Sequence, residues 1–348
     1  MKFTFDSRKV EPGMGFVALK GEKVDGRDFI DAAKAAGAVR IINGLGELHA
    51  AALEKRRSLK AKVIGVTGSS GKTTTKEFLR VFLNCPATEG NFNNHIGLPM
   101  TILNCPDDAE FLVVEMGTNH PGEIATLCDI AEPDIGVLVS LGSAHMEHFG
   151  SKEAIANEKT TLLKRAKDLS FRWDEVESAP FECPLPGVHN KTNMSLAYAV
   201  ARALGVSQQE CEERLNNFSL PGERWREVEK WGVKFIDDSY NANPESMKAA
   251  IDAFAEMKCS GHKTLVLGDM FELGENALEK HREVFEYAMK FHFKLVIGVG
   301  EMSSRCLCNL VYKNVATLKK KFRLDVSAGD LVLLKASHSM HLSDLIKD

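Results

Sequence analysis

Residues 61–76, AKVIGVTGSSGKTTTK, have the residue types and spacing of a loop that binds phosphate. The apolar, β-branched run 62–66 predicts a buried parallel strand, and residues 75–83 have helical spacing. The glycines between them let the backbone wrap around phosphates with its N–H groups pointing inward, at the positive end of the helix dipole. We expect Lys72 to reach the β- and γ-phosphates of ATP and the Thr73 hydroxyl to bind Mg²⁺. The residues expected to hold the nucleotide here are Gly68, Ser69, Ser70, Gly71, Lys72, Thr73 and Thr74.

The loop departs from the usual pattern G-x-x-x-x-G-K-[ST], because Val66 stands where the first glycine belongs. The simplest alternative is a glycine-rich turn that binds nothing. The order of strand, loop, lysine, hydroxyl and helix favours nucleotide binding over that alternative.

The overall composition is that of a globular protein with two or three domains. The 348 residues are 44% hydrophobic and 26% charged. The net charge of −4 and the pI near 6.3 argue against a nucleic-acid or polybasic membrane partner. No apolar run is long enough to predict insertion into a membrane, and the N-terminal residues MKFTFDSRKVEPG lack the apolar core of a signal peptide. Eight scattered cysteines indicate reduced thiols, so we expect a cytoplasmic protein.

Short apolar runs alternate with helical stretches, which predicts α/β layers with largely parallel sheets. Helices are expected at 193–204 and 247–257, and the polar segment 164–186 is expected to be a surface connection. The expected strands after the phosphate loop are 111–115, 135–141, 233–237, 264–267, 295–299 and 331–334.

Several motifs in the same order resemble the Mur ligase family, the ATP-dependent amide-forming enzymes of peptidoglycan assembly. They include GVTGSSGKTTTKEFL, TEGNFNNHIGLPMTIL, VVEMGTNHPGEI, SAHMEHFGS, PGVHNKTN, IDDSYNANPESMKAAI and LLKASHSMHLSDLI. The resemblance implies three α/β domains: a small substrate-nucleotide domain at 1–59, a central ATPase domain with a mainly parallel sheet at 60–219, and a Rossmann-like domain at 220–348. This chain is shorter than its relatives, so the first domain is expected to be reduced.

The same resemblance implies that ATP phosphorylates a substrate carboxylate and that an amine then attacks the acyl phosphate. The step implied is addition of D-alanyl-D-alanine to UDP-N-acetylmuramoyl-tripeptide, with two Mg²⁺ ions and a monomeric enzyme acting on small molecules. One alternative is a Mur-like ligase that joins an amino acid or peptide to a non-murein carboxylate. A second is a non-catalytic ATP-binding module that regulates a partner.

Three residues after the phosphate loop are candidates to support metal ions. Glu115 ends an apolar strand, where open α/β folds bind ligands, and its hard oxygens suit Mg²⁺. The resemblance assigns a second metal to His145 and makes Lys159 a lysine carried as an N-carbamate, which requires a lowered amine pKa. The alternatives are a strand-end carboxylate in solvent for Glu115, a structural histidine for His145 and an ordinary exposed helix lysine for Lys159.

Further nucleotide contacts are implied on both sides of the expected domain boundary. Asn190 and Asn193 would contact adenine, because an amide offers a donor and an acceptor, although either asparagine could instead be a helix N-cap. Arg224 would approach the γ-phosphate on domain closure, with Arg226 as a competing candidate. The other residues assigned by resemblance to the nucleotide cleft are Asp238, Tyr240 and Asn243.

The substrate residues implied by the resemblance lie in three places. Ser7 and Arg8 belong to the region for the uridine diphosphate, and Asn91, Asn93 and Asn94 to the loop along the muramoyl peptide. Lys335 and His338 lie near the acceptor. His338 stands where the family has an arginine, which removes a bidentate partner for a carboxylate and puts the acceptor specificity in question.

Overall fold

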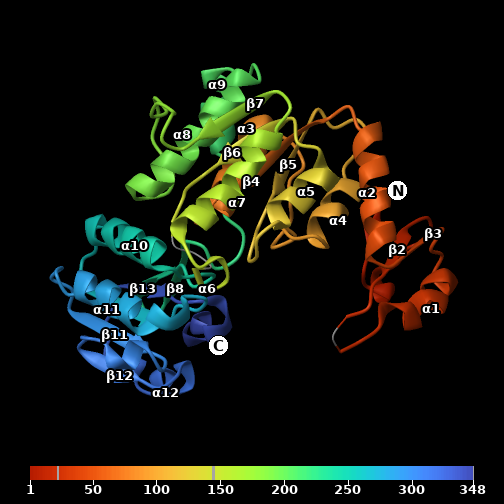
Figure 1. The fold of residues 1–348 in the computed structure, drawn as a ribbon. Coiled ribbons are helices and arrows are strands. Elements are labelled where there is room, and N and C mark those ends of the chain that lie inside the picture. Colours follow the sequence, from red (N-terminus) through yellow and green to blue (C-terminus); the bar gives the residue numbers. More distant parts are fainter. Residues whose placement is uncertain (22, 143–145, 348) are drawn as a thin grey trace.

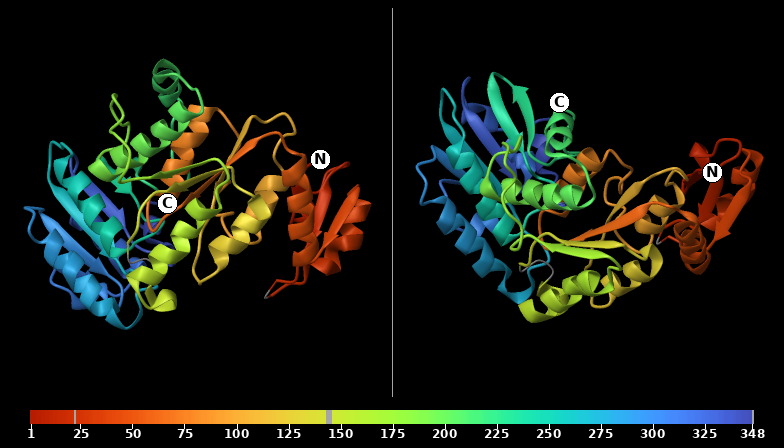
Figure 2. Two further views of the ribbon diagram at one scale, coloured as in Figure 1. Left: turned by 45° about the horizontal axis from the view of Figure 1, so that its top comes forward. Right: turned by 90° about the horizontal axis from the view of Figure 1, so that it is seen from above.

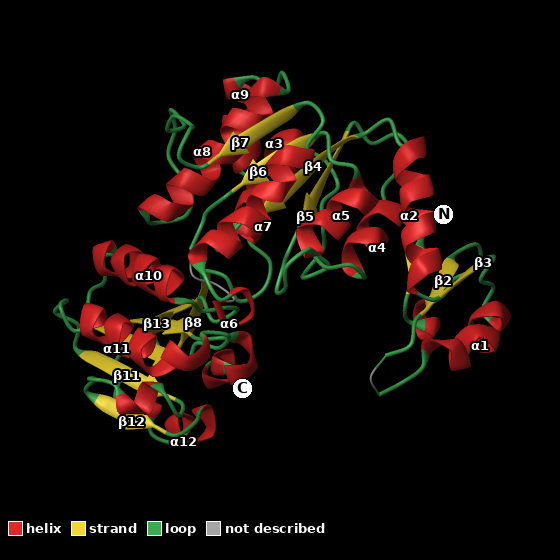
Figure 3. Ribbon diagram, in the orientation of Figure 1, coloured by secondary structure: helices red, strands yellow, loops and turns green. Residues whose placement is uncertain are grey.

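The computed structural model describes residues 1–21, 23–142 and 146–347, which form three sheets in succession along the chain (Figure 1, Figure 3). Figure 2 shows the N-terminal and C-terminal domains at opposite ends of the central one. The α/β class with parallel sheets is confirmed, and the three sheets lie at residues 3–43, 62–172 and 226–335. The domain boundaries stay a prediction.

The N-terminal domain has a small parallel sheet in the order β1-β2-β3. Apolar residues of this sheet and of α2 join the same core as residues of α4 and α5, so α2 connects the domain to the central one. Its elements are β1 (Phe3–Thr4), η1 (Ser7–Lys9), β2 (Gly15–Ala18), η2 (Gly26–Phe29), α1 (Ile30–Ala35), β3 (Arg40–Asn43) and α2 (Leu45–Ser58).

The central sheet is parallel throughout, in the order β5-β4-β6-β7. The phosphate-loop strand β4 is therefore interior and buried on both faces. Its elements are β4 (Lys62–Thr67), α3 (Lys72–Leu83), α4 (Gly97–Leu103), β5 (Phe111–Glu115), α5 (Glu123–Ala131), β6 (Ile135–Leu138), α6 (Met146–Phe149), α7 (Lys152–Arg165), β7 (Leu169–Arg172), α8 (Val188–Ala203) and α9 (Gln208–Leu215).

The C-terminal sheet has the order β12-β11-β10-β13-β9-β8, in which only β8 is antiparallel to its neighbour. One face packs against α10 and α11, and the other against α12 and the C-terminal turns. Its elements are β8 (Arg226–Lys230), β9 (Val233–Asp237), α10 (Pro244–Glu256), β10 (Lys263–Gly268), η3 (Gly274–Asn276), α11 (Ala277–Ala288), β11 (Leu295–Val299), η4 (Ser303–Arg305), β12 (Leu310–Tyr312), α12 (Val315–Lys319), η5 (Phe322–Leu324), β13 (Leu331–Lys335), η6 (His338–Met340) and η7 (Leu342–Leu345).

Differences from the expected elements have local causes. Helix α10 begins three residues before the expected start, because the Asn243 side chain caps it and Pro244 occupies its first turn. Strand β6 ends at Leu138, since the chain then turns so that the Ser140 hydroxyl can bond to the main chain of Ser70. The segment 164–186 lies mostly at the surface, as expected of a surface connection, but it also contains the edge strand β7.

Candidate active site

The predicted strand, loop and helix are confirmed at β4 and α3. Gly71 has a φ of +81°, and a Cβ there would lie 2.6 Å from the side-chain oxygen of Asn193, so only glycine fits. The Lys72 ammonium donates to the Gly68 carbonyl at 2.9 Å, folding back along the loop. Burial lowers the pKa of Lys72, and the nearby Glu115 carboxylate opposes that shift. The Lys72 side chain thus lies over the loop, with its terminal nitrogen bonded to the main chain of the loop itself.

Glu115 and Thr73 meet directly beneath the loop. The Thr73 hydroxyl donates to Glu115 Oε2 at 2.8 Å, and the Asn93 amide donates to Glu115 Oε1 at 2.8 Å. Glu115 is only 2% exposed, so the alternative of a carboxylate in solvent is wrong. A buried carboxylate and a hydroxyl at the head of a helix are hard oxygen donors at the edge of the sheet.

A buried lysine that sequence reasoning missed supports the loop carrying Asn93. The Lys76 ammonium donates to the Thr88 carbonyl at 2.7 Å and lies 2.5 Å from Glu77 Oε1. The Thr88 hydroxyl in turn accepts from the main-chain N–H of Glu115 at 2.9 Å. Lys76 therefore positions the turn that holds Glu115. The sequence feature that could have identified Lys76 is its position on the inner face of α3, one helical turn after Lys72.

Lys159 is a buried residue of α7, only 1% exposed, so the alternative of an exposed helix lysine is wrong. Burial, together with the charge of Lys72, lowers the pKa of its amine from 10.5 to about 7. Glu158 opposes the shift, and its carboxylate accepts from the N–H groups of Gly122 and Ile124 at the start of α5. A substantial neutral fraction of Lys159 near pH 7 is the condition for carbamate formation. His145 lies outside the described residues.

The oxygen atoms of Thr73 and Glu115 fit Mg²⁺ by their chemistry, and neither carries a nitrogen or sulfur donor that would favour a softer metal. Within residues 1–21, 23–142 and 146–347, no three side chains of the His, Cys, Asp and Glu types gather closely enough to form a metal site by themselves. Any ion at this edge would therefore share its coordination with phosphate or other oxygens.

A cavity of about 440 Å³ lies between the central and C-terminal domains. It brings together residues that are far apart in the sequence, on the phosphate loop, α8 and the ends of β9 and β13. The predicted site residues that line it are Ser69, Ser70, Gly71, Lys72, Thr73, Thr74, Asn93, Glu115, Asn190, Asn193, Arg224, Asp238, Tyr240, Asn243 and Lys335. Lining residues that we did not predict include Ser140, Trp173, His189, Leu220 and Trp225.

Asn190 and Asn193 are buried on the cavity side of α8. The N-cap of this helix is Gly187, so the alternative that either asparagine is the cap is wrong. The Asn190 amide donates to the Pro186 carbonyl at 2.7 Å, and Asn193 approaches Gly71 of the loop. Both amides thus lie where the wall of the cavity meets the phosphate loop.

Two arginines near the domain boundary have different environments. The Arg224 guanidinium lies 3.4 Å from the ring centre of Tyr240, and both side chains line the cavity. Arg226 forms an ion pair with Asp237 at 2.7 Å, on paired strands of the sheet. Arg224 is therefore the arginine placed to meet a ligand in the cavity.

Lys335 and Asp238 form an ion pair on the C-terminal wall. The Lys335 ammonium is 2.6 Å from Asp238 Oδ2 and donates to the Asn241 carbonyl at 3.1 Å. Because β9 and β13 are neighbouring parallel strands, their carboxyl ends meet at this edge. The same wall reaches the loop through Asn243, whose amide donates to the Ser70 hydroxyl at 2.9 Å.

The remaining predicted substrate residues lie outside the cavity lining. Ser7 and Arg8 lie on η1, where Arg8 is paired with Asp6. Asn91 and Asn94 flank Asn93, and the Asn94 side chain accepts from the N–H groups of Ile96 and Gly97 at the start of α4. His338 is an exposed residue of η6 whose ring lies 5.1 Å from that of Tyr240.

Three family models match the chain: the Mur ligase family catalytic domain at residues 3–78, the Mur ligase middle domain at 66–172 and the Mur ligase glutamate ligase domain at 223–338. A UDP-N-acetylmuramoyl-tripeptide–D-alanyl-D-alanine ligase from Bacillus subtilis is 30% identical over 419 positions, which cover 99% of this chain and 92% of that protein. This chain belongs to the Mur ligase family.

Solved structures of Mur ligases agree with this assignment. MurF from Acinetobacter baumannii superposes with a TM-score of 0.86 at 26% identity, covering 99% of this chain and 92% of that one. MurF ligase from Thermotoga maritima, solved in complex with ADP, superposes with a TM-score of 0.84 at 30% identity, covering 99% and 96%. The chain therefore has the three-domain Mur ligase fold. Since the Bacillus alignment is longer than the 348 residues here, internal segments of that relative have no counterpart.

Proposed function

We propose that this Mur ligase uses ATP to join D-alanyl-D-alanine to UDP-N-acetylmuramoyl-tripeptide, with Mg²⁺ as the metal. The observation that carries the proposal is the interdomain cavity, which has a phosphate loop on one wall and the Lys335–Asp238 pair on the other. The full-length similarity to D-alanyl-D-alanine ligases supports the choice of substrates.

The reaction requires two anionic substrates to approach each other. The γ-phosphate of ATP bonds to an oxygen of the tripeptide carboxylate, and ADP departs. The amine of D-alanyl-D-alanine then bonds to the acyl carbon, which releases inorganic phosphate and forms the amide. Cations must offset the charge that accumulates during both steps. Lys72 and Arg224 lie in the cavity to do this, and a bound Mg²⁺ would further neutralise the phosphates.

Thr73 and Glu115 would hold one metal ion. Lys159 as a carbamate, together with His145, would support the second. The lowered pKa of Lys159 favours the neutral amine that reacts with carbon dioxide. Asn190 and Asn193 would face the adenine. Asn93 would lie along the muramoyl peptide, with its amide holding the Glu115 carboxylate in place.

The test is release of phosphate from ATP across a panel of UDP-muramoyl peptides, each combined with D-alanyl-D-alanine or with single amino acids. We expect turnover to require the tripeptide and the dipeptide together, with free D-alanine a poor acceptor. The same assay is repeated with carboxylates that are not muramoyl peptides, and turnover only with these would identify a non-murein ligase. ATP binding without turnover on any carboxylate would identify the regulatory module.

A further inference from the structure

The segment from Met302 to Leu324 has the opposite charge balance to the chain as a whole. Its 23 residues contain six lysines and arginines and no carboxylate, whereas the whole chain has a net charge of −4. Chain-wide composition therefore conceals a locally basic region. Four of the six cations fall within five residues: Lys319, Lys320, Lys321 and Arg323.

The same segment exposes large apolar side chains. Leu324 is 86% exposed, and Leu307 and Val311 are each more than half exposed. Lysines and single apolar side chains are each common on protein surfaces, so their combination at one place is what bears on function. Leu324, next to Arg323 in the sequence, therefore presents an apolar side chain to the surface beside a cation.

A strained tryptophan lies beside this segment. Trp231 and Gly232 form the two-residue turn of the β8–β9 hairpin, and both have positive φ values, +59° and +73°. Such turns favour asparagine and glycine, and the left-handed conformation is unfavourable for a bulky side chain. Trp231 is nevertheless 38% exposed. Backbone strain retained at an exposed aromatic residue is typical of functional positions.

Aromatic and cation–π contacts connect the hairpin to the basic segment. The Arg323 guanidinium lies 5.7 Å from the Trp231 ring, and Lys230 lies 5.1 Å from it. Phe235 lies between, with its ring 6.2 Å from Trp231 and 6.2 Å from Phe322. We call the resulting surface the distal patch, which consists of Trp231, Lys319, Lys320, Lys321, Arg323 and Leu324.

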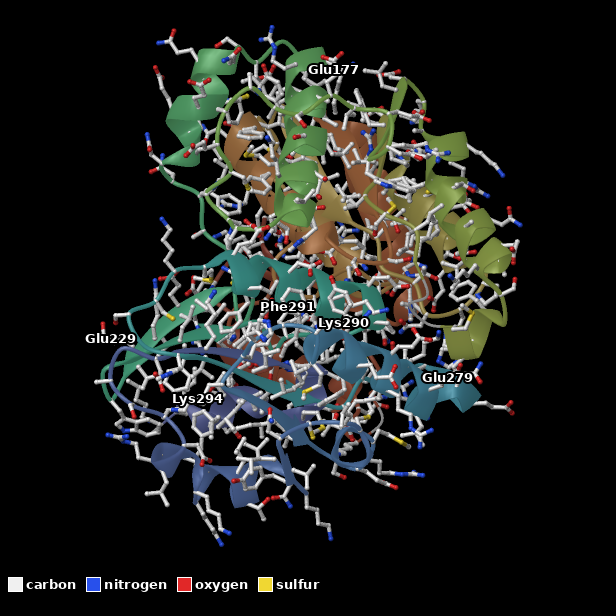
Figure 4. The ribbon with its side chains drawn as sticks, turned by 90° about the vertical axis from the view of Figure 1, so that its left-hand side faces the viewer. Glu177, Glu229, Glu279, Lys290, Phe291 and Lys294 are labelled. Atoms are coloured by element: carbon white, nitrogen blue, oxygen red, sulfur yellow. The ribbon has the colours of Figure 1, made fainter. Side chains whose placement is uncertain are left out.

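The distal patch faces away from the cavity. Residues of α12 and η5 pack on the face of the C-terminal sheet opposite to α10, the helix whose start touches the phosphate loop. Figure 1 shows α12 at the end of the C-terminal domain that is remote from the central domain. Lys294 belongs to the same domain and is labelled in Figure 4. Its ammonium donates to the carbonyl of Asp325, the residue that follows Leu324 of the patch in the sequence. A flat partner could thus cover the patch while the cavity stays open.

We propose that the distal patch docks this protein on an anionic lipid surface. Lipid headgroup phosphates complement the four cations, and attraction to them is strongest within a Debye length of the surface. Indole rings favour the boundary between headgroups and hydrocarbon, where Leu324 could also leave water. The protruding leucine favours a bilayer over nucleic acid or an acidic protein, which offers phosphate or carboxylate but no hydrocarbon layer. The contact is peripheral, since no described helix is long and apolar enough to cross a membrane.

The test is cosedimentation of the full chain with vesicles of phosphatidylcholine alone and of phosphatidylcholine mixed with phosphatidylglycerol. We expect binding only to the anionic vesicles, and loss of binding at high salt. Changing Lys319, Lys320, Lys321 and Arg323 together to glutamine should weaken the binding by more than about tenfold. The matched control changes four exposed lysines spread over the three domains, Lys34, Lys60, Lys152 and Lys258, to glutamine and should bind like the wild type.

Two single variants separate a bilayer from other polyanions. Trp231→Asn suits the turn and should keep the fold, and Leu324→Ser removes only the protruding side chain; each should weaken vesicle binding about threefold or more. Absence of binding to anionic vesicles at low salt, or equal loss in the matched control, would overturn the proposal. So would retention of vesicle binding by both single variants together with patch-dependent binding to single-stranded DNA or polyglutamate, which would indicate a soluble polyanionic partner. The assay involves no catalysis, so its outcome is independent of the proposed ligase activity.

Discussion

The Asn243 side-chain amide donates to the Ser70 hydroxyl at 2.9 Å, joining the C-terminal domain to the phosphate loop across 173 residues of sequence. The oxygen of the same side chain accepts from the Ser246 N–H and caps α10. One asparagine therefore both starts a helix and fixes that helix against the loop. Because its amide group has a donor and an acceptor end, it performs the two roles at once.

Substitutions of Asn243 should separate these two roles. Asn243→Ala removes both, so we expect a loss of about 1 kcal/mol of stability and a several-fold higher KM for ATP. Asn243→Ser keeps the cap but is too short to reach Ser70, so the KM should rise while stability stays close to wild type. Thermal unfolding and ATP-dependent phosphate release measure the two effects. An unchanged KM in the serine variant would contradict a role for the contact in nucleotide binding.

Removing the side chain of either Lys72 or Glu115, at the phosphate-loop edge of the central sheet, should abolish ligation. Lys72→Ala removes a charge that faces the phosphates, and Glu115→Ala removes a carboxylate that would hold a metal ion. We expect each to lower phosphate release by about a thousandfold or more, while circular dichroism shows the wild-type fold. Lys62→Ala serves as the control, since this exposed lysine is the first residue of β4, at the opposite end of that strand from the phosphate loop. Ligation near wild-type rates in either site variant would rule out the assignment.

Lys159→Ala should be nearly inactive if the lysine acts as a carbamate. Added formate or acetate should then restore part of the turnover, because a small carboxylate can occupy the space of the lost group. Lys164→Ala, at the end of the same helix, is the matched control and should need no rescue. Full activity of Lys159→Ala without added carboxylate would show that the lysine has no catalytic role.

The lowered pKa of Lys159 also predicts a pH dependence. The value is about 7 in the folded protein and near 10.5 when exposed, so the unfolded chain binds more protons between these values. The contribution of this residue to the free energy of unfolding should therefore rise with pH between about 7 and 10.5. Below pH 7 the protein bears the full cost of burying the charged amine. Denaturant unfolding of wild type and Lys159→Met at several pH values checks this. Parallel curves for the two proteins would contradict it.

The buried Lys76 ammonium should be required for full stability. Lys76→Met leaves the Thr88 carbonyl without a donor, while the Glu77 carboxylate keeps Arg80 as its partner. We expect a loss of about 1–3 kcal/mol in denaturant unfolding. Stability equal to that of the wild type would exclude this explanation.

His338→Arg tests the acceptor side of the cleft. The His338 ring is tilted against the Tyr240 ring at 5.1 Å, and its Nδ1 lies 3.6 Å from the Glu223 carboxylate, next to the wall that holds Lys335. A guanidinium is always charged, so the KM for D-alanyl-D-alanine should fall by up to about tenfold if one charge-assisted hydrogen bond to the dipeptide carboxylate forms. His341→Arg is the neighbouring control. An unchanged KM would mean that His338 does not face that carboxylate.

The sequence by itself determined the parts of the protein that depend on local spacing. The strand, loop and helix around Lys72 follow from a β-branched run, glycines and helical periodicity, and Glu115 follows from its place at the end of an apolar strand. These features need only neighbouring residues, so a linear pattern is enough to find them.

Only the tertiary structure decided which side chains share the cavity. Trp173 carried no local signal, because its place in the cavity arises from packing between segments that the sequence places apart. The choice of Arg224 over Arg226 as the arginine facing the cavity depends on the pairing of β8 with β9. This pairing places Arg226 opposite Asp237, with which it forms an ion pair. The pKa of Lys159 likewise depends on desolvation by surrounding elements, a property of the folded interior that residue spacing does not contain.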